Sequence, residues 1–162
     1  MKYSVLVLSV CALPALADVN IVGNVAAKCI IQTDTGGIYG NPTATKLSTL
    51  PADGGVVPIV RYDVAVANYY TAKITHPSAF SSSPSLSDTV AWTGASSVAQ
   101  TSVAGMAAYD AAKVVYGSTT NFNLTIAGST WFKTASTATY GVSKAFPGGS
   151  YTAIVQAECI AN

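Results

Sequence analysis

The stretches DVNIVGNVAAKCIIQ (residues 18–32) and SYTAIVQAECI (residues 150–160) point to the fold of this chain. In both stretches, apolar or small residues alternate with other residues, which is the pattern of a strand with one face against a core. The first apolar face consists of Val19, Ile21, Gly23, Val25, Ala27, Cys29 and Ile31. The second consists of Tyr151, Ala153, Val155, Ala157 and Cys159, with Gly149 just before it. Both ends of the chain are therefore predicted to be strands that carry a cysteine on the apolar face.

Residues 1–17, MKYSVLVLSVCALPALA, have the features of a signal peptide. Lys2 precedes a short apolar run, and Ala15-Leu16-Ala17 gives the small-x-small pattern of a cleavage site. The run is too short to span a bilayer, which needs about 20 residues, and no later stretch is longer without polar residues. We therefore expect an exported protein that begins at Asp18 and has no membrane span.

Removal of this leader would leave two of the three cysteines, Cys29 and Cys159. In an oxidising compartment such a pair is expected to form a disulfide, the alternative being two buried thiols. The bridge would close a loop of 130 residues (159 − 29). In the chain-entropy model, closing a loop of that length contributes about 5 kcal/mol to stability.

The sequence leaves open how the two end strands lie relative to one another. If they pair antiparallel with Cys29 opposite Cys159, residues 18–25 overhang the last strand without a partner. If they pair parallel, Ile21 faces Tyr151, and the whole first strand belongs to its own sheet. The first arrangement would make a strand for donation to another molecule, and the second would make a closed sandwich.

Short strand-like segments separated by turn-rich clusters fill the rest of the chain. They lie at 56–66, 68–75, 89–94, 111–117, 121–128 and 129–135, with clusters such as PADGG and SSSPSLSD between them. Such a series predicts an all-β fold, an immunoglobulin-like antiparallel β-sandwich. Residues 103–113, VAGMAAYDAAK, predict one short helix because they are rich in good helix formers. We expect one domain over residues 28–162, preceded by the strand 18–27.

Charge and composition argue against several functions. The chain carries 8 Lys and Arg against 7 Asp and Glu, for a net charge of +1, and no cluster of cations. Nucleic-acid binding therefore has no electrostatic basis. The one histidine, His76, has no nearby His, Cys or carboxylate cluster with which to bind a metal or act as a base. We predict no catalytic residues, no metal and no cofactor. The aromatic residues are assigned to the core, with sugar stacking on Trp92 or Trp131 as the alternative.

In these features the chain resembles the subunits of bacterial fimbriae that are assembled by the chaperone–usher route, including spore-coat-protein-U-like relatives. The resemblance rests on a signal peptide followed at once by an alternating strand and a cysteine, with Val25, Cys29 and Ile31 near the family spacing. Gly23 stands midway along the apolar face, as glycine does in the family's donor strands. The C-terminal PGGSYTAIVQAECIAN is similar to the family's last strand, although Ala161 replaces the usual aromatic residue and the family's disulfide joins other strands.

The resemblance implies a subunit of a surface fibre that polymerises when its N-terminal strand enters a neighbouring subunit. Val19, Ile21, Gly23, Val25 and Ala27 would be the donated face, and Gly149, Tyr151, Ala153, Val155 and Ala157 would belong to the subunit's own C-terminal strand. A periplasmic chaperone, an outer-membrane usher and copies of the same or related subunits are the implied partners, and the destination is the cell surface or the medium. The alternative is a self-contained secreted sandwich that binds a carbohydrate or protein at the cell surface.

Overall fold

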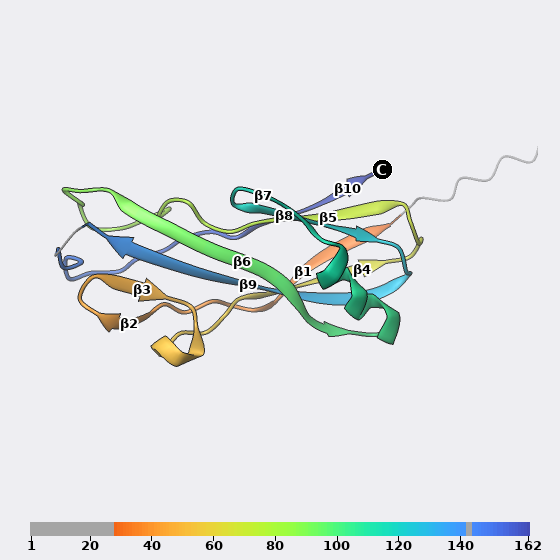
Figure 1. Cartoon of the computed structure of the whole chain (residues 1–162), viewed down its shortest axis with the longest axis horizontal. Helices are drawn as coiled ribbons and strands as arrows, with labels where there is room; N and C mark the ends of the chain where they lie inside the picture. Colours follow the sequence, from red (N-terminus) through yellow and green to blue (C-terminus); the bar gives the residue numbers. More distant parts are fainter. Residues whose placement is uncertain (1–27, 142–143) are drawn as a thin grey trace, which may run out of the picture.

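The computed structural model describes residues 28–141 and 144–162, which form a sandwich of two antiparallel sheets (Figure 1). This confirms the predicted all-β class. The first sheet contains β1 (Cys29–Thr35), β2 (Gly40–Thr43), β3 (Lys46–Ser48), β4 (Ile59–Val64), β6 (Val90–Thr101) and β9 (Gly128–Tyr140). The second contains β5 (Tyr70–Thr75), β7 (Val114–Tyr116), β8 (Thr119–Leu124) and β10 (Gln156–Ala161).

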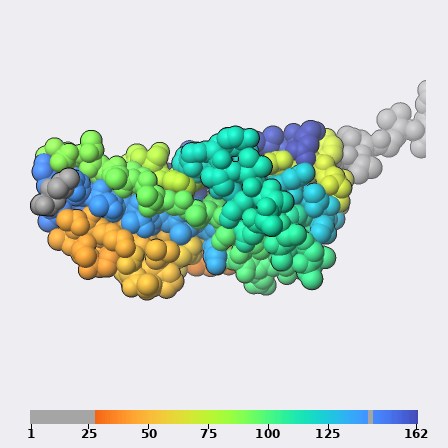
Figure 2. Space-filling model, viewed as in Figure 1, coloured from red at the N-terminus to blue at the C-terminus, as the bar shows by residue number. Residues whose placement is uncertain are grey.

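Strand β9 is the central strand of the first sheet. It pairs with β6 along one side, and with β4 and then β3 along the other. Beyond β4 lies β1, at the edge of the sheet, while the second sheet has the order β10-β5-β8-β7, which places β10 at its edge. The molecule is elongated along β9, and the start of β1 and the C-terminus lie near the same end (Figures 1 and 2).

The core lies between β4 and β9 of one sheet and β5 and β8 of the other. Alternate residues of each strand face inward, as the period of two requires. Tyr62 and Phe132 meet edge to face with their ring centroids 5.6 Å apart, and Phe122 lies 4.3 Å from Phe132. All three are fully buried, as is Ile74 of β5. The assignment of the aromatic residues to the core is thus confirmed for Tyr62, Phe122 and Phe132, but it is wrong for Tyr69 and Tyr116, which are exposed.

A second cluster, of aromatic residues, packs at the other end of the sandwich. Phe80, in the segment between β5 and β6, contacts four other rings at centroid distances of 4.7 to 6.3 Å: Tyr39, Trp92, Phe146 and Tyr151. Phe146 also stacks on Tyr140 of β9. This cluster fastens the connecting segments to the first sheet.

The predicted helix over 103–113 is a short helical segment, made of the 3-10 helix η2 (Ala104–Ala108) and α1 (Tyr109–Ala112). It is coloured teal in Figures 1 and 2. Met106 is fully buried in the core, and the Tyr109 hydroxyl accepts a hydrogen bond of 3.0 Å from the backbone N–H of Ile126. These two side chains fix the segment over β8. A further 3-10 helix, η1, spans Pro51–Asp53.

Both predicted arrangements of the end strands are wrong. Strand β1 pairs antiparallel with β4, and β10 pairs antiparallel with β5, so the two strands belong to different sheets. Alternation showed correctly that each strand has one face toward the core, but the same alternation occurs on either layer of a sandwich. The predicted arrangements also assigned residues 18–27 either to an overhanging strand or to the chain's own sheet. These residues lie outside the described residues.

Several strand boundaries also differ from the prediction, among them that of β6, which runs to Thr101 instead of ending at residue 94. The run 150–160 becomes a strand only from Gln156, and residues 150–155 contribute one bridge, between Thr152 and Ser82. Strand β2 lies in GNPTAT (40–45), whose glycine, proline and small polar residues are typical of a turn, and β3 follows directly after it. Strand β9 extends to Tyr140, beyond the predicted end at residue 135, through a Ser/Thr/Ala-rich stretch that carries little hydrophobic signal.

Tyr62 ties the two sheets together, and its hydroxyl provides a test of this contact. The hydroxyl donates to the backbone oxygens of Glu158 (3.1 Å) and Lys73 (3.3 Å) in the opposite sheet, and burial raises the pKa of the phenol. Tyr62→Phe should reduce the free energy of unfolding by about 1–2 kcal/mol in a denaturant titration, because the buried acceptors lose their donor. The control Tyr69→Phe changes a residue that is 43% exposed and should have little effect. Equal effects of the two substitutions would contradict this role.

Candidate functional site

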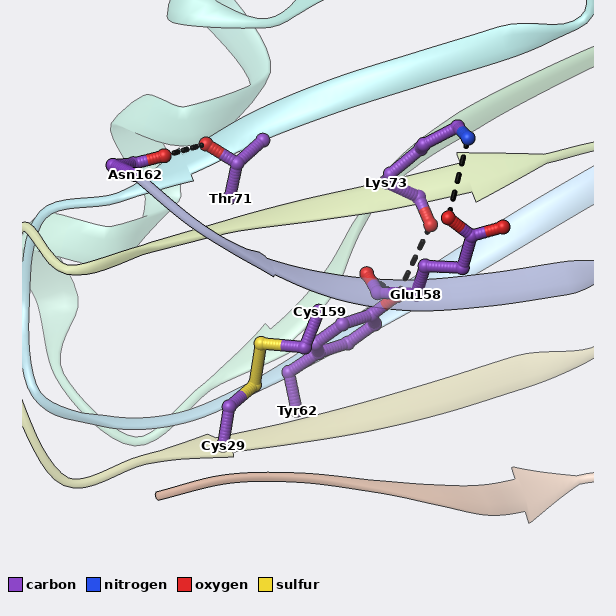
Figure 3. Close-up of a disulfide and its surroundings, with 7 residues drawn as sticks. All are labelled: Cys29, Tyr62, Thr71, Lys73, Glu158, Cys159 and Asn162. Carbon is purple, nitrogen blue, oxygen red and sulfur yellow. Dashed lines mark hydrogen bonds and ion pairs between the residues drawn. A yellow bond between two sulfur atoms is a disulfide. The ribbon is translucent and has the colours of Figure 1, made fainter. Parts of the chain in front are cut away.

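The predicted disulfide between Cys29 and Cys159 is present, and it links the two edge strands (Figure 3). Cys29 begins β1, at the edge of the first sheet, and Cys159 lies in β10, at the edge of the second. Their Cα atoms are 6.4 Å apart. The bridge therefore closes the gap between the layers at this end of the molecule, next to Tyr62.

Away from the disulfide, the two edge strands are separated by a groove, which we call the edge groove. Its first section has a volume of about 420 Å³. One wall comprises Ile31, Thr33 and Thr35 of β1, followed by Gly36 and Gly37; the other comprises Ala157, Val155 and Ala153. The floor includes Tyr39, Thr49, Pro58, Val60, Pro77 and Ser136.

A second section of the edge groove continues toward the aromatic end of the molecule. It has a volume of about 660 Å³, and it lies between residues 37–41 and residues 146–153. Gly37, Tyr39 and Ala153 line both sections. The groove therefore follows the C-terminal segment from Ala157 back to Phe146, and Tyr39 and Ala153 lie at the junction of its two sections.

The groove exists because the two layers do not close against each other here. Within the described residues, β1 pairs only with β4, and residues 150–155 pair with the rest of the chain only at Thr152. Strand β5 ends at Thr75, and the buried Pro77 that soon follows has no N–H with which to continue the ladder. The C-terminal segment consequently separates from β5, and one edge on each side of the groove has backbone groups without a ladder partner among residues 28–141 and 144–162.

Close backbone packing shapes the β1 wall. A Cβ at Gly37 would lie 2.9 Å from the ring of Pro58, so a larger residue would displace that ring. The glycine thus lets residues 36–38 pass close to the start of β4. This bend takes the chain from β1 to Tyr39, whose ring lies on the groove floor.

The floor at the junction is partly polar. The Tyr39 hydroxyl lies 3.2 Å from Ser136 Oγ, and burial raises the pKa of this phenol although the hydrogen bond with Ser136 acts in the other direction. Thr49 Oγ1 in turn accepts a hydrogen bond from the Ser136 N–H at 2.9 Å. These contacts hold the Tyr39 ring in place at the junction of the two sections.

The structure brings the predicted C-terminal residues together on one wall. Ala153, Val155 and Ala157 line the first section, and Gly149, Tyr151 and Ala153 line the second. From 151 to 159 half-buried and exposed residues alternate, as expected. The predicted donor residues Val19, Ile21, Gly23, Val25 and Ala27 lie outside the described residues.

Sequence reasoning missed the residues of the floor. Tyr39, Pro77 and Ser136 come from three distant parts of the chain, and no local pattern connects them. The signal that could have located the groove was proline, because Pro58 and Pro77 each interrupt pairing next to a strand.

The residues considered for other chemistry occupy structural positions. His76 Nδ1 lies 3.1 Å from the backbone oxygen of Pro77, and Trp92 packs on Phe80. Trp131, on the outer face of β9, donates from its indole nitrogen to Asp34 at 3.1 Å, and the Arg61 guanidinium lies over its ring. In the part of the chain that the structure describes, no three His, Cys, Asp or Glu residues are placed to hold a metal ion.

A search of the described helices found none long and apolar enough to cross a membrane. Comparisons of the chain with protein-family models, with curated proteins and with solved structures gave no match. The edge groove is therefore the feature of the described residues that bears most directly on function.

Proposed function

We propose that this protein is a structural subunit of a surface fibre, and that its edge groove receives the N-terminal strand of a neighbouring copy. The observation that carries the proposal is the groove itself, which is open between two strand edges with free backbone groups. Addition of a strand to such an edge is a recurrent mode of protein association, in which ladder hydrogen bonds provide affinity and side-chain pockets provide specificity.

The dimensions of the groove suit the proposed ligand. Residues 149–157, which form one wall, would extend over roughly 30 Å, and residues 18–27 would extend over about 33 Å. The wall is mostly apolar or small, and so is the face formed by Val19, Ile21, Gly23, Val25 and Ala27. Burial of each large apolar side chain is worth about 1.5–3 kcal/mol.

The direction of entry follows from the position of the chain ends. Strand β1 begins at the disulfide end (Figure 1), so the residues that precede Cys29 are joined to the sandwich at that end. A donor that runs antiparallel to residues 149–157 has its own body at the opposite, aromatic end. Entry and departure are then at opposite ends, and subunits can repeat head to tail.

The middle of the groove favours a particular register. Tyr39 and Ala153 line both sections of the groove, and Gly23 is the middle residue of the donor face, so we place Gly23 opposite Ala153. Antiparallel pairing then sets Ile21 opposite Val155 and Val19 opposite Ala157. In this register the residue without a side chain meets the Tyr39 ring.

The chaperone and usher partners and the export route remain part of the same proposal, and their support is the sequence resemblance together with the open groove. An edge of this kind is prone to aggregation until it is paired. A chaperone that covers the edge would prevent this aggregation before assembly. In the alternative, a self-contained secreted binding module, the chain's own residues 18–27 would fill the groove and the protein would be a stable monomer.

Ala153→Trp tests the proposal. An indole at the junction should fill the groove next to Tyr39 and reduce the yield of polymer at least tenfold, measured by light scattering and electron microscopy. The matched control is Ile154→Trp, because Ile154 is the next residue along the same segment and is 59% exposed. The control variant should polymerise like the unmodified protein.

Circular dichroism and the unfolding midpoint establish whether each variant is folded. Polymer formation by a folded Ala153→Trp variant at the normal rate would exclude the groove as the receiving site. An unmodified protein that stays monomeric, with residues 18–27 protected from hydrogen exchange, would support the self-contained module instead.

A further inference from the structure

The Cys29–Cys159 disulfide lies at one end of the edge groove, where the two walls come closest. Neighbouring strands in a sheet are about 4.8 Å apart, so a strand inserted between two others holds them roughly 9.6 Å apart. The Cα atoms of Cys29 and Cys159 are only 6.4 Å apart, and a covalent bond joins them. No extended chain fits between the walls at this point.

We infer that this disulfide is the end stop of the groove and fixes the register and length of the incoming strand. The inference deepens the proposed function and depends on it. With Gly23 opposite Ala153, paired residue numbers sum to 176, so Asp18 lies opposite Glu158 and residue 17 would lie opposite Cys159. In this register the disulfide lies next to the first residue after the predicted cleavage site.

This agreement has two independent sources. The register was set at the middle of the groove, by Tyr39 and Ala153, and the end stop was located by the disulfide. The cleavage site came from the sequence of the leader. A strand that slid two residues deeper would keep its apolar face inward, so alternation alone does not prevent that slip. The disulfide prevents it.

Hydrogen exchange on added peptides tests the end stop. The intact oxidised protein is mixed with an excess of an isotopically labelled peptide of residues 18–27, or of a peptide extended to residues 13–27. We expect slowed exchange, by tenfold or more, at amides throughout residues 18–27 of both peptides, because successive N–H groups of an inserted strand pair with opposite walls. The five added residues should exchange at the rate of the free peptide.

An extension at the other end supplies the control. A peptide of residues 18–31 with Cys29→Ser should show the same protection over 18–27, and its added residues leave the groove at the open end. Protection of residues 13–17 in the longer peptide on the oxidised protein would overturn the end stop. The end stop would also be overturned if the protected segment of the longer peptide were shifted by two residues relative to that of the shorter peptide.

The outcome also separates this inference from the proposed function. If none of the peptides is protected, and none competes with polymerisation, strand acceptance itself is wrong. If all the peptides are protected but protection does not end at Asp18, the groove accepts strands and the disulfide does not limit how far they enter. A Cys29→Ala/Cys159→Ala variant that remains folded should admit residues 16 and 17 of the extended peptide.

Discussion

A mixture of two variants that cannot polymerise alone is expected to give a dimer that grows no further. The first variant, Ala153→Trp, has a blocked groove and an intact N-terminal strand, so it can only donate. The second, Gly23→Leu, has an intact groove and a strand that should overpack against Tyr39, so it can only accept. Size-exclusion chromatography with light scattering should show monomers for each variant alone and a complex of one donor with one acceptor for the mixture.

The expected change in polymer yield is large because one variant has a defective groove and the other has a defective strand, and each contact between subunits needs both. Each defect should lower polymer yield at least tenfold, while the mixture should convert most of the protein to dimer. Deletion of residues 18–25 provides a second acceptor, in case the leucine at position 23 still enters. A mixture that stays monomeric although both variants are folded would contradict strand exchange between subunits.

A control mixture checks that dimerisation is specific. Ala153→Trp combined with a chain that carries both Ala153→Trp and Gly23→Leu contains no free groove, and it should remain monomeric. Dimer formation in that mixture would place the contact on another surface, such as the exposed edge strand β7, whose Val114, Val115 and Tyr116 are all exposed.

Alternation in the sequence was sufficient to predict the layers of this fold. Tyr62, Ile74 and Phe132 face the core because each lies on the apolar side of a strand whose side chains alternate every residue. The disulfide was predictable from two cysteines in a chain that was expected to be exported. The short helical segment followed from the composition of residues 103–113.

The partners of the end strands could not be predicted in the same way. Alternation reports that a face is buried, and it is the same whether β10 pairs with β1 or with β5. The choice depends on contacts between residues more than 80 positions apart, such as those of Glu158 with Lys73 and Tyr62. No local pattern encodes these contacts.

The groove was predictable only in part. One wall, from Tyr151 to Ala157, was identified from its pattern and from the family resemblance. The floor was not, because Tyr39 follows a glycine pair that looks like an ordinary turn and Ser136 lies in a Ser/Thr-rich stretch without hydrophobic signal. The junction of the two sections became visible only from the structure, in which Tyr39 lies against Ser136.

Loss of the Cys29–Cys159 disulfide is expected to have the largest effect on stability. The bridge closes a loop with a sequence separation of 130 residues. In the chain-entropy model, its removal lets the unfolded chain gain conformational freedom worth about 5 kcal/mol. Small domains are stable by only about 5–15 kcal/mol in total, so much of the stability of this sandwich should depend on one bond.

Denaturant titration of the oxidised protein, the reduced protein and Cys29→Ala/Cys159→Ala measures this contribution. Reduction removes the cross-link and keeps both side chains, whereas the double substitution also removes sulfur atoms that pack against the core beside Tyr62. The reduced protein should therefore lose about 5 kcal/mol, and the double variant should lose somewhat more. The slope of unfolding free energy against denaturant should rise in both, because an uncrosslinked chain exposes more surface. A reduced protein within about 1 kcal/mol of the oxidised one would mean that β1 and β10 are held mainly by β4 and β5, and that the disulfide acts on the groove rather than on the fold.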